Sequence, residues 1–244
     1  MLSEMGKTPK ERELYLRKEK IARYAEMEKC LRRYFLLLIA NIIFGVISAF
    51  CSAVIVGPYW DTPAGGTGFH VMTIVIGIIS ASICGAAVYH IFRMNRLYDG
   101  FNTSGVFYTV QIVLSFIQLF VVDSPGAYLF FQGSAAVASI LFSINFAGNM
   151  TGVFDMTDAY QSEKWASFKK TYTGLLIATF VAVGMCIIPG FAILGLIAIV
   201  LICIGTVGVM IWFIVLIYQS AESFKIVGAR EAKEIAKEEN AALA

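Results

Sequence analysis

The chain has 244 residues, of which 58% are hydrophobic and only 15% are charged. Water-soluble domains carry roughly 25% charged residues, so this composition excludes an ordinary soluble domain and predicts a protein whose main partner is the lipid bilayer. The formal net charge is only +2, and without overall basicity we expect no nucleic-acid partner.

Residues 1–33 are predicted to form a cytoplasmic N-terminal helical extension. Thr8, Pro9 and Glu11 fit a capping box with proline at the first helical position, which predicts a helix that begins there. The segment contains ten Lys and Arg and six Asp and Glu residues, which favours a solvated extension. Its partial apolar face leaves contact with a negatively charged leaflet as the alternative. The segment is also too long to be the basic region of a cleaved signal peptide.

Six long apolar stretches follow the extension and are predicted to be membrane-spanning helices. A helix needs about 20 residues to cross the hydrocarbon of a bilayer, and its backbone must satisfy its own hydrogen bonds there. The sequence therefore predicts an all-α fold, a polytopic membrane helix bundle with six transmembrane helices arranged as three consecutive helical hairpins. The membrane domain is placed at residues 34–218, with spans at 34–56, 71–92, 105–122, 128–149, 171–188 and 191–218. Similar segments before each hairpin are compatible with a three-fold repeat of a two-span unit.

The apolar run 105–149 contains the sequence DSPGA at residues 123–127. Adjacent Pro and Gly predict a turn, and one uninterrupted helix would bury Asp123 in the membrane at a cost of about 2.5–3.5 kcal/mol. We therefore predict two antiparallel spans in this run. The same dipeptide at 189–190 predicts the turn between the last two spans.

The positions of the basic residues predict the orientation in the membrane. All 19 Lys and Arg residues lie in the N-terminal segment, in the connections at 93–104 and 150–170, or in the tail at 219–244. The connections that contain none are 57–70, 123–127 and 189–190. Because basic residues are enriched in cytoplasmic segments, we expect a multi-pass protein of the cell membrane with both termini in the cytoplasm. Residues 219–244 are then a charged cytoplasmic C-terminal helix or tail.

Reactive side chains do not form a recognisable catalytic or metal site. A Ser, His and Asp trio could be drawn from Asp61, His70, Asp123 and Ser124, but none of them lies in a nucleophile motif. We interpret His70 and His90 as anchors at the ends of spans rather than as metal ligands. The sequence therefore predicts no enzymatic activity and no cofactor.

Acidic and cysteine residues on the cytoplasmic side are interpreted as structural. Asp155, Asp158 and Glu163 could hold a cation, but they lack the regular ligand spacing of a calcium loop. Asp158 and Gln161 are typical of the N-terminal cap of a helix. Four of the five cysteines lie within spans and Cys30 lies on the cytoplasmic side, so we predict no disulfide.

Small and weakly polar side chains recur at helical period in each of the first four spans. They are Asn41, Ser48 and Ser52 in the first span, Thr73 and Ser80 in the second, Gln111, Ser115 and Gln118 in the third, and Gln132, Ser139 and Ser143 in the fourth. Apolar side chains occupy the other positions, so we expect these polar intramembrane faces to turn toward the interior of the bundle.

Two functions are compatible with inward polar faces. Small and amide side chains let membrane helices pack closely and form hydrogen bonds with one another, which favours an accessory or assembly subunit of a membrane complex with no enzymatic role. Its partners would be other membrane proteins or further copies of this chain. The alternative is a channel or carrier for a neutral or small solute, because no span contains a charged residue of the kind that coupled transporters use.

Overall fold

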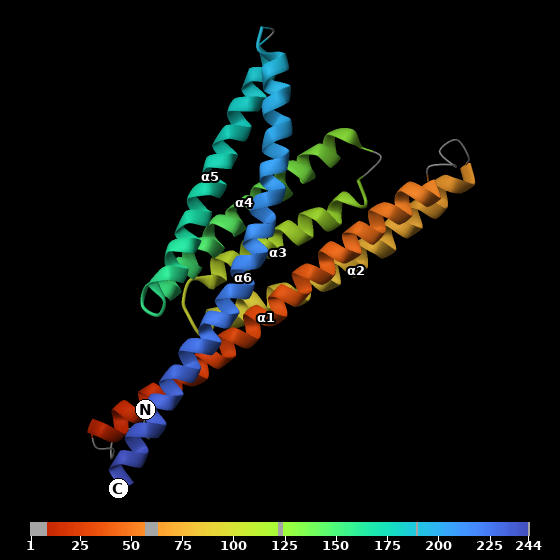
Figure 1. Ribbon diagram of the computed structural model, residues 1–244. Helices are drawn as coiled ribbons and strands as arrows, with labels where there is room; N and C mark the ends of the chain where they lie inside the picture. The colour runs from red at the N-terminus through yellow and green to blue at the C-terminus, as the bar shows by residue number, and fades with distance from the viewer. Residues whose placement is uncertain (1–8, 57–62, 122–123, 189, 244) are drawn as a thin grey trace.

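The computed structural model describes the backbone of residues 9–56, 63–121, 124–188 and 190–243, and the side chains of these residues apart from 51–56, 63–70, 73, 192, 242 and 243. It consists of six α-helices joined by short connections (Figure 1). In chain order they are α1 Pro9–Val56, α2 Pro63–Asn95, α3 Phe101–Gln118, α4 Pro125–Asp155, α5 Ala159–Ile187 and α6 Ala192–Leu243. The described residues include no strand, and the predicted all-α fold is confirmed.

Five of the helices, all except α3, are long and apolar enough to cross a membrane. The chain is therefore a multi-pass membrane protein. Helix α3 has 18 residues, which makes it the shortest of the six, and it includes the polar side chains of Gln111 and Gln118. It nevertheless runs antiparallel to α4 within the second hairpin, and both chain termini lie at the same end of the bundle (Figure 1).

Several helices extend beyond the predicted spans. Helix α1 has 48 residues and α6 has 52, which correspond to about 72 and 78 Å at 1.5 Å per residue. Both exceed the roughly 30 Å of a hydrocarbon core, so the charged segments continue the membrane helices without a break. Helix α2 begins at Pro63, so the backbone is helical over residues 63–70, before the start of the predicted span at 71. Proline is well tolerated at the first position of a helix.

The turn in the run 105–149 is confirmed, because α3 ends at Gln118 and α4 begins at Pro125. The backbone N–H of Val121 donates to the carbonyl of Gln118 at 3.3 Å, and Ser124 has the extended backbone of a helix N-cap. Asp123 itself lies outside the described residues. A single long helix is thereby excluded.

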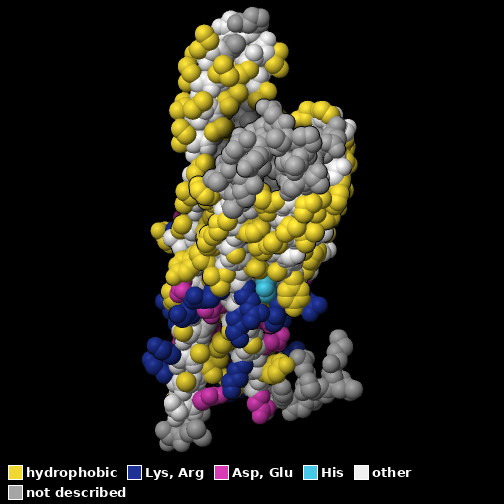
Figure 2. Space-filling model, turned by 90° about the vertical axis from the view of Figure 1, so that its right-hand side faces the viewer, with side chains coloured by type: hydrophobic (Ala, Val, Ile, Leu, Met, Phe, Trp, Pro, Cys, Tyr) yellow, Lys and Arg dark blue, Asp and Glu magenta, His cyan; other side chains and the backbone are white. Residues whose placement is uncertain are grey.

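The helices form a closed ring in which each helix contacts its neighbours in the sequence, and α6 returns to contact α1. Among the described residues, no other pair of helices has closely approaching backbones, although aromatic side chains of α4 contact those of α1 and α6 across the ring. The three hairpins share a base, but the tips of α1–α2 and α5–α6 diverge from each other (Figure 1). We call the end that holds both termini the charged end, and Figure 2 shows Lys and Arg side chains gathered there below an apolar surface.

The main core lies toward the charged end and is aromatic. Phe146 of α4 is fully buried, and its ring centroid lies 5.7 Å from Tyr34 of α1, 5.6 Å from Phe101 of α3 and 5.8 Å from Trp165 of α5. Phe213 of α6 completes the cluster at 5.7 Å. The ring of helices is therefore filled by stacked and edge-on aromatic side chains at this level.

Beyond this core, α1 and α6 run side by side as an antiparallel pair. Three ion pairs join them: Arg17 to Glu238 at 2.8 Å, Lys18 to Glu239 at 2.8 Å, and Lys20 to Glu231 at 2.7 Å. These side chains are partly or largely exposed, so each pair contributes little to the free energy of folding. The pairs nevertheless fix the register of the two long helices.

Candidate functional site

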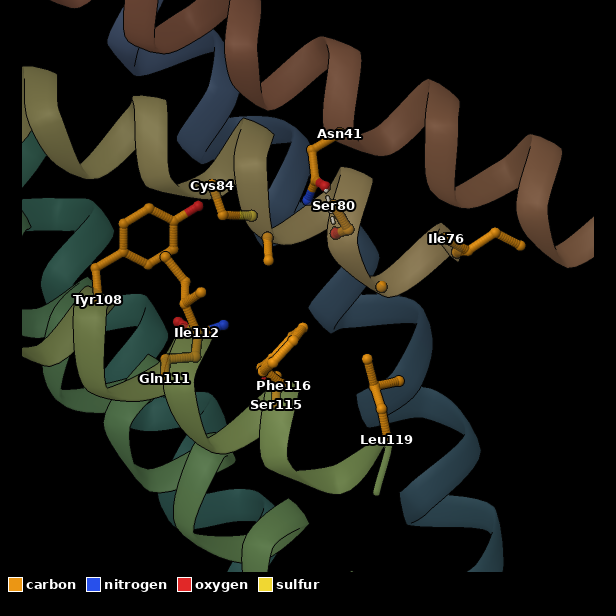
Figure 3. Close-up of a pocket in the computed structure, with 12 residues that line it drawn as sticks. Asn41, Ile76, Ser80, Cys84, Tyr108, Gln111, Ile112, Ser115, Phe116 and Leu119 are labelled. Carbon is orange, nitrogen blue, oxygen red and sulfur yellow. Dashed lines mark hydrogen bonds between the residues drawn. The ribbon is translucent and has the colours of Figure 1, made fainter. Parts of the chain in front are cut away.

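A pocket of about 360 Å³ lies between α1, α2 and α3 and is the candidate site. Four of the predicted polar residues line it: Asn41, Ser80, Gln111 and Ser115 (Figure 3). Apolar side chains such as Ile112 and Phe116 form the rest of the wall. The pocket therefore combines neutral hydrogen-bonding groups with an apolar lining, which is typical of sites for small uncharged molecules.

One pair of polar side chains bridges α1 and α2 in this pocket. The Ser80 hydroxyl donates a hydrogen bond to Asn41 Oδ1 at 3.0 Å, and the two groups point toward each other in Figure 3. In lipid an unpaired amide or hydroxyl is costly, so this bond stabilises the first hairpin. The side chains of Cys84 and Tyr108 lie beside each other at the other side of the pocket (Figure 3).

The side-chain amides of the two glutamines of α3 have fewer hydrogen-bond partners. Gln111 Oε1 and Gln118 Nε2 are both buried, and neither has a hydrogen-bond partner among the described residues. Buried polar atoms usually have a partner in the protein or in ordered water. Gln111 lines the pocket and Gln118 lies two turns further along the same helix, so this side of α3 retains unused hydrogen-bonding capacity.

Glycine at position 77 permits the close approach of α2 and α3 at one side of the pocket. A Cβ added there would lie 2.1 Å from Leu119 Cδ1, so the Leu119 side chain occupies the space that a larger residue would need. Leu119 therefore closes the pocket at the end of α3.

The other predicted polar residues lie elsewhere. On α4, the Ser143 hydroxyl donates to the carbonyl of Ser139 within the same helix, and Gln132 is exposed. Ser48 is partly buried on α1 but does not line the pocket. The side chains of Ser52 and Thr73 lie outside the described residues. The structure thus brings together polar residues from three helices and leaves those of α4 apart.

A second polar cluster at the charged end was not predicted as a site. The hydroxyl of Ser220 accepts hydrogen bonds from Trp165 Nε1 at 2.9 Å and Gln161 Nε2 at 3.1 Å, and all three residues are buried. Lys164 donates to Gln219 Oε1 at 2.9 Å in the same contact. The sequence contained a signal for it, because the tripeptide YQS occurs at both 160–162 and 218–220.

The predicted cap of α5 is confirmed, since the Asp158 carboxylate accepts a hydrogen bond from the backbone N–H of Gln161 at 3.2 Å. Its other oxygen accepts from Ser223 at 2.6 Å. Asp155 accepts from the Ser162 hydroxyl. Both carboxylates are thus engaged in contacts between helices, and the described His, Cys, Asp and Glu residues include no group of three that could hold a metal ion.

Two titratable groups at the charged end have raised pKa values. Burial raises the pKa of the Cys30 thiol, although Arg93 and Arg33 act in the opposite direction. Burial also raises the pKa of Tyr98 to about 12. Both groups therefore stay protonated at neutral pH. His70, one of the predicted anchors, has no described side chain, and His90 is buried.

The four described cysteines, Cys30, Cys84, Cys186 and Cys203, are free thiols.

Comparisons with protein-family models, with curated proteins and with solved structures find no match for this chain.

Proposed function

We propose that the chain is a non-enzymatic accessory or assembly subunit of a membrane complex. The aromatic core is the observation that carries the proposal. A conduit needs a path along the axis of the ring, but Phe146, Trp165 and Phe101 fill that axis toward the charged end and are fully buried. A subunit that holds other proteins in place needs no such path.

The lateral surface supports the same proposal. Toward its tip, α6 exposes apolar side chains on the faces that do not pack against α5, including Ile193 at 75% and Ile204 at 66%. Within the described chain, the backbone of α6 closely approaches only those of α5 and α1, and the hairpin tips diverge (Figure 1). The diverging hairpins therefore offer a long apolar surface to lipid and to neighbouring membrane helices.

The proposed location is the cell membrane, with both termini in the cytoplasm. The gathering of Lys and Arg at the charged end (Figure 2) supports this orientation through the positive-inside rule. Single cysteines introduced as Thr67→Cys and Gly228→Cys in a cysteine-free background provide the test. In intact cells, an impermeant maleimide should label position 67 and not position 228, and the reverse result would invert the orientation.

A second candidate function is a carrier for a small neutral solute, and the pocket between α1, α2 and α3 favours it. The pocket offers amide and hydroxyl groups without any charge. The variant that tests this function is Gln111→Leu with Gln118→Leu, which removes the unpaired amides and makes this side of α3 apolar.

Two measurements on the tagged full-length protein separate the candidates. For an assembly subunit, crosslinking in native membranes followed by purification should recover another membrane protein, or a second copy, in a fixed ratio. Liposomes containing the purified protein should then show no flux of glycerol or urea above protein-free liposomes. Clear flux that disappears in the stably folded double glutamine variant would replace the assembly proposal by the carrier.

A further inference from the structure

At the part of the charged end that is farthest from the apolar surface, basic side chains form ion pairs with carboxylates. Arg17, Lys18 and Lys20 of α1 each have a carboxylate of α6 within 2.9 Å. Their charge is therefore largely neutralised by the protein itself. These residues need no external counter-ion.

Basic residues next to the apolar stretches are different. They are Lys29 and Arg33 on α1, Arg96 after α2, and Lys169 and Lys170 on α5. All five are exposed, and none has a carboxylate within 4.0 Å among the described residues. We call them the boundary cations.

The boundary cations come from α1, from α5 and from the connection after α2, but they lie at one level of the bundle. Arg33 directly precedes the apolar run of α1, Arg96 follows that of α2, and Lys170 precedes that of α5. Figure 2 shows Lys and Arg side chains in a band where the apolar surface ends. Such a band coincides with the depth of lipid headgroups when the apolar surface lies in hydrocarbon.

Exposed apolar side chains lie close to these cations, and such surroundings favour an amphiphilic ligand. Leu36 lies one turn from Arg33 and is 62% exposed, and Ile177 lies two turns from Lys170 and is 60% exposed. Lys169 Nζ lies 3.4 Å from the position of a Cβ at Gly148, so its ammonium group rests against the bare backbone of α4. A molecule that carries both a phosphate and acyl chains can contact the cations and the apolar side chains together, whereas free phosphate or a nucleic acid contacts the cations alone.

We propose that the boundary cations bind the phosphates of anionic phospholipids in one leaflet, so that specific lipids complete the charge balance of the bundle at this level. The lipids neutralise the cations for which the described chain supplies no carboxylate.

The test compares two triple variants that lose the same charge. The first is Arg33→Gln, Lys169→Gln and Lys170→Gln at the boundary. The control is Arg17→Gln, Lys18→Gln and Lys20→Gln, whose positions lie about 20 Å or more along α1 from Arg33 at 1.5 Å per residue. That distance exceeds the Debye length of about 8 Å at physiological salt, so the control charges act weakly on the leaflet.

The measurement is retention of phosphatidylglycerol against phosphatidylcholine, counted by native mass spectrometry after extraction from mixed nanodiscs. Each juxtamembrane cation contributes a factor of about five to the binding of an anionic surface. The boundary variant should therefore retain phosphatidylglycerol roughly a hundredfold less strongly, whereas the control should remain within about fivefold of the parent.

Three results would overturn the proposal. In the first, the parent protein retains phosphatidylglycerol and phosphatidylcholine equally. In the second, the control variant loses as much affinity for phosphatidylglycerol as the boundary variant does. In the third, inorganic phosphate raises the melting temperature of the detergent-solubilised parent as much as phosphatidylglycerol does. If the boundary variant fails to fold, the salt dependence of lipid retention by the parent protein tests the proposal instead. Its preference for phosphatidylglycerol should then fall steeply with added salt, and a preference that is independent of salt would exclude the boundary cations as the cause.

Discussion

At the charged end, the buried rings of Tyr34, Phe146 and Trp165 contact side chains from all three hairpins. At the opposite end, the buried side chains are small, such as Ala135 on α4 and Ala182 on α5, and the tips of the hairpins diverge (Figure 1). Large interlocking side chains fix the relative positions of several helices at once, because a close-packed interior tolerates little change in volume. Small residues fix only pairs of helices.

This difference assigns different tasks to the two regions. The charged end holds the ring together, and polar groups such as Ser220 specify how α5 and α6 meet there. The opposite end keeps each hairpin intact while its outer faces expose apolar side chains. A subunit that must accommodate other membrane proteins benefits from such a division, since one end stays fixed while the other adapts.

The largest expected effect tests the aromatic core. Phe146→Ala removes a fully buried ring with neighbours on four other helices, so the free energy of unfolding should fall by about 3–5 kcal/mol. The matched control is Phe180→Ala, whose ring is 76% exposed on α5 and whose loss should cost far less. Unfolding of both variants in the same detergent micelles provides the measurement, and equal losses would remove the distinction between the two regions.

The next effect tests the polar contact between α5 and α6. Ser220→Ala leaves the buried Trp165 Nε1–H without an acceptor and leaves Gln161 Nε2 only the carbonyl of Leu216 at 3.5 Å. This change should lower the free energy of unfolding by about 1–3 kcal/mol. Ser134→Ala is the control, because the hydroxyl of Ser134 is bonded only to the carbonyl of Phe130 in its own helix. If Ser134→Ala lowers the free energy of unfolding as much as Ser220→Ala does, the loss arises from removing a serine hydroxyl from a helix and not from breaking the contact between α5 and α6.

A third change examines the point at which the opposite end is tightly packed. A Cβ at Gly195 would lie 2.9 Å from the backbone nitrogen of Cys186 and 3.0 Å from the carbonyl oxygen of Ala182, so Gly195→Ala must push α5 and α6 apart. We expect a loss of about 1–2 kcal/mol, at the lower end of overpacking costs because a hairpin tip can adjust. Gly208→Ala on the same helix has open space and should stabilise by up to about 1 kcal/mol through helix propensity. Melting temperatures that move in the same direction for both would contradict the close contact.

The smallest effect concerns the pocket. Gln111→Leu with Gln118→Leu removes amide atoms that have no partner in the described chain, so the stability should change by less than about 0.6 kcal/mol or even rise. Ser80→Ala is the comparison, since it removes the bond to Asn41 and should cost about 0.6 kcal/mol. Detergent melting measures both. A loss above about 1.7 kcal/mol in the double variant would mean that the amides have partners in the membrane.

The amino-acid sequence by itself determined the elements of this protein. The absence of charge over long stretches, together with the need of the backbone to bond to itself in lipid, leaves only helices of the observed kind. Local signals determined where helices stop and start, as Pro125 does for α4 and Asp158 does for α5. These signals act within a few residues, so no knowledge of the fold is needed to interpret them.

Only the tertiary structure decided which faces meet. Apolar side chains lie on all sides of most of the spans, so periodicity cannot fix the rotation of a helix about its axis. For that reason Gln111 and Ser80 share a pocket while Gln132, which has the same helical period, is exposed. The two YQS tripeptides are visible in the sequence, but their contact depends on α6 crossing α5 at Ser220. The closing contact of α6 with α1 likewise joins residues more than two hundred positions apart, a distance over which no local signal acts.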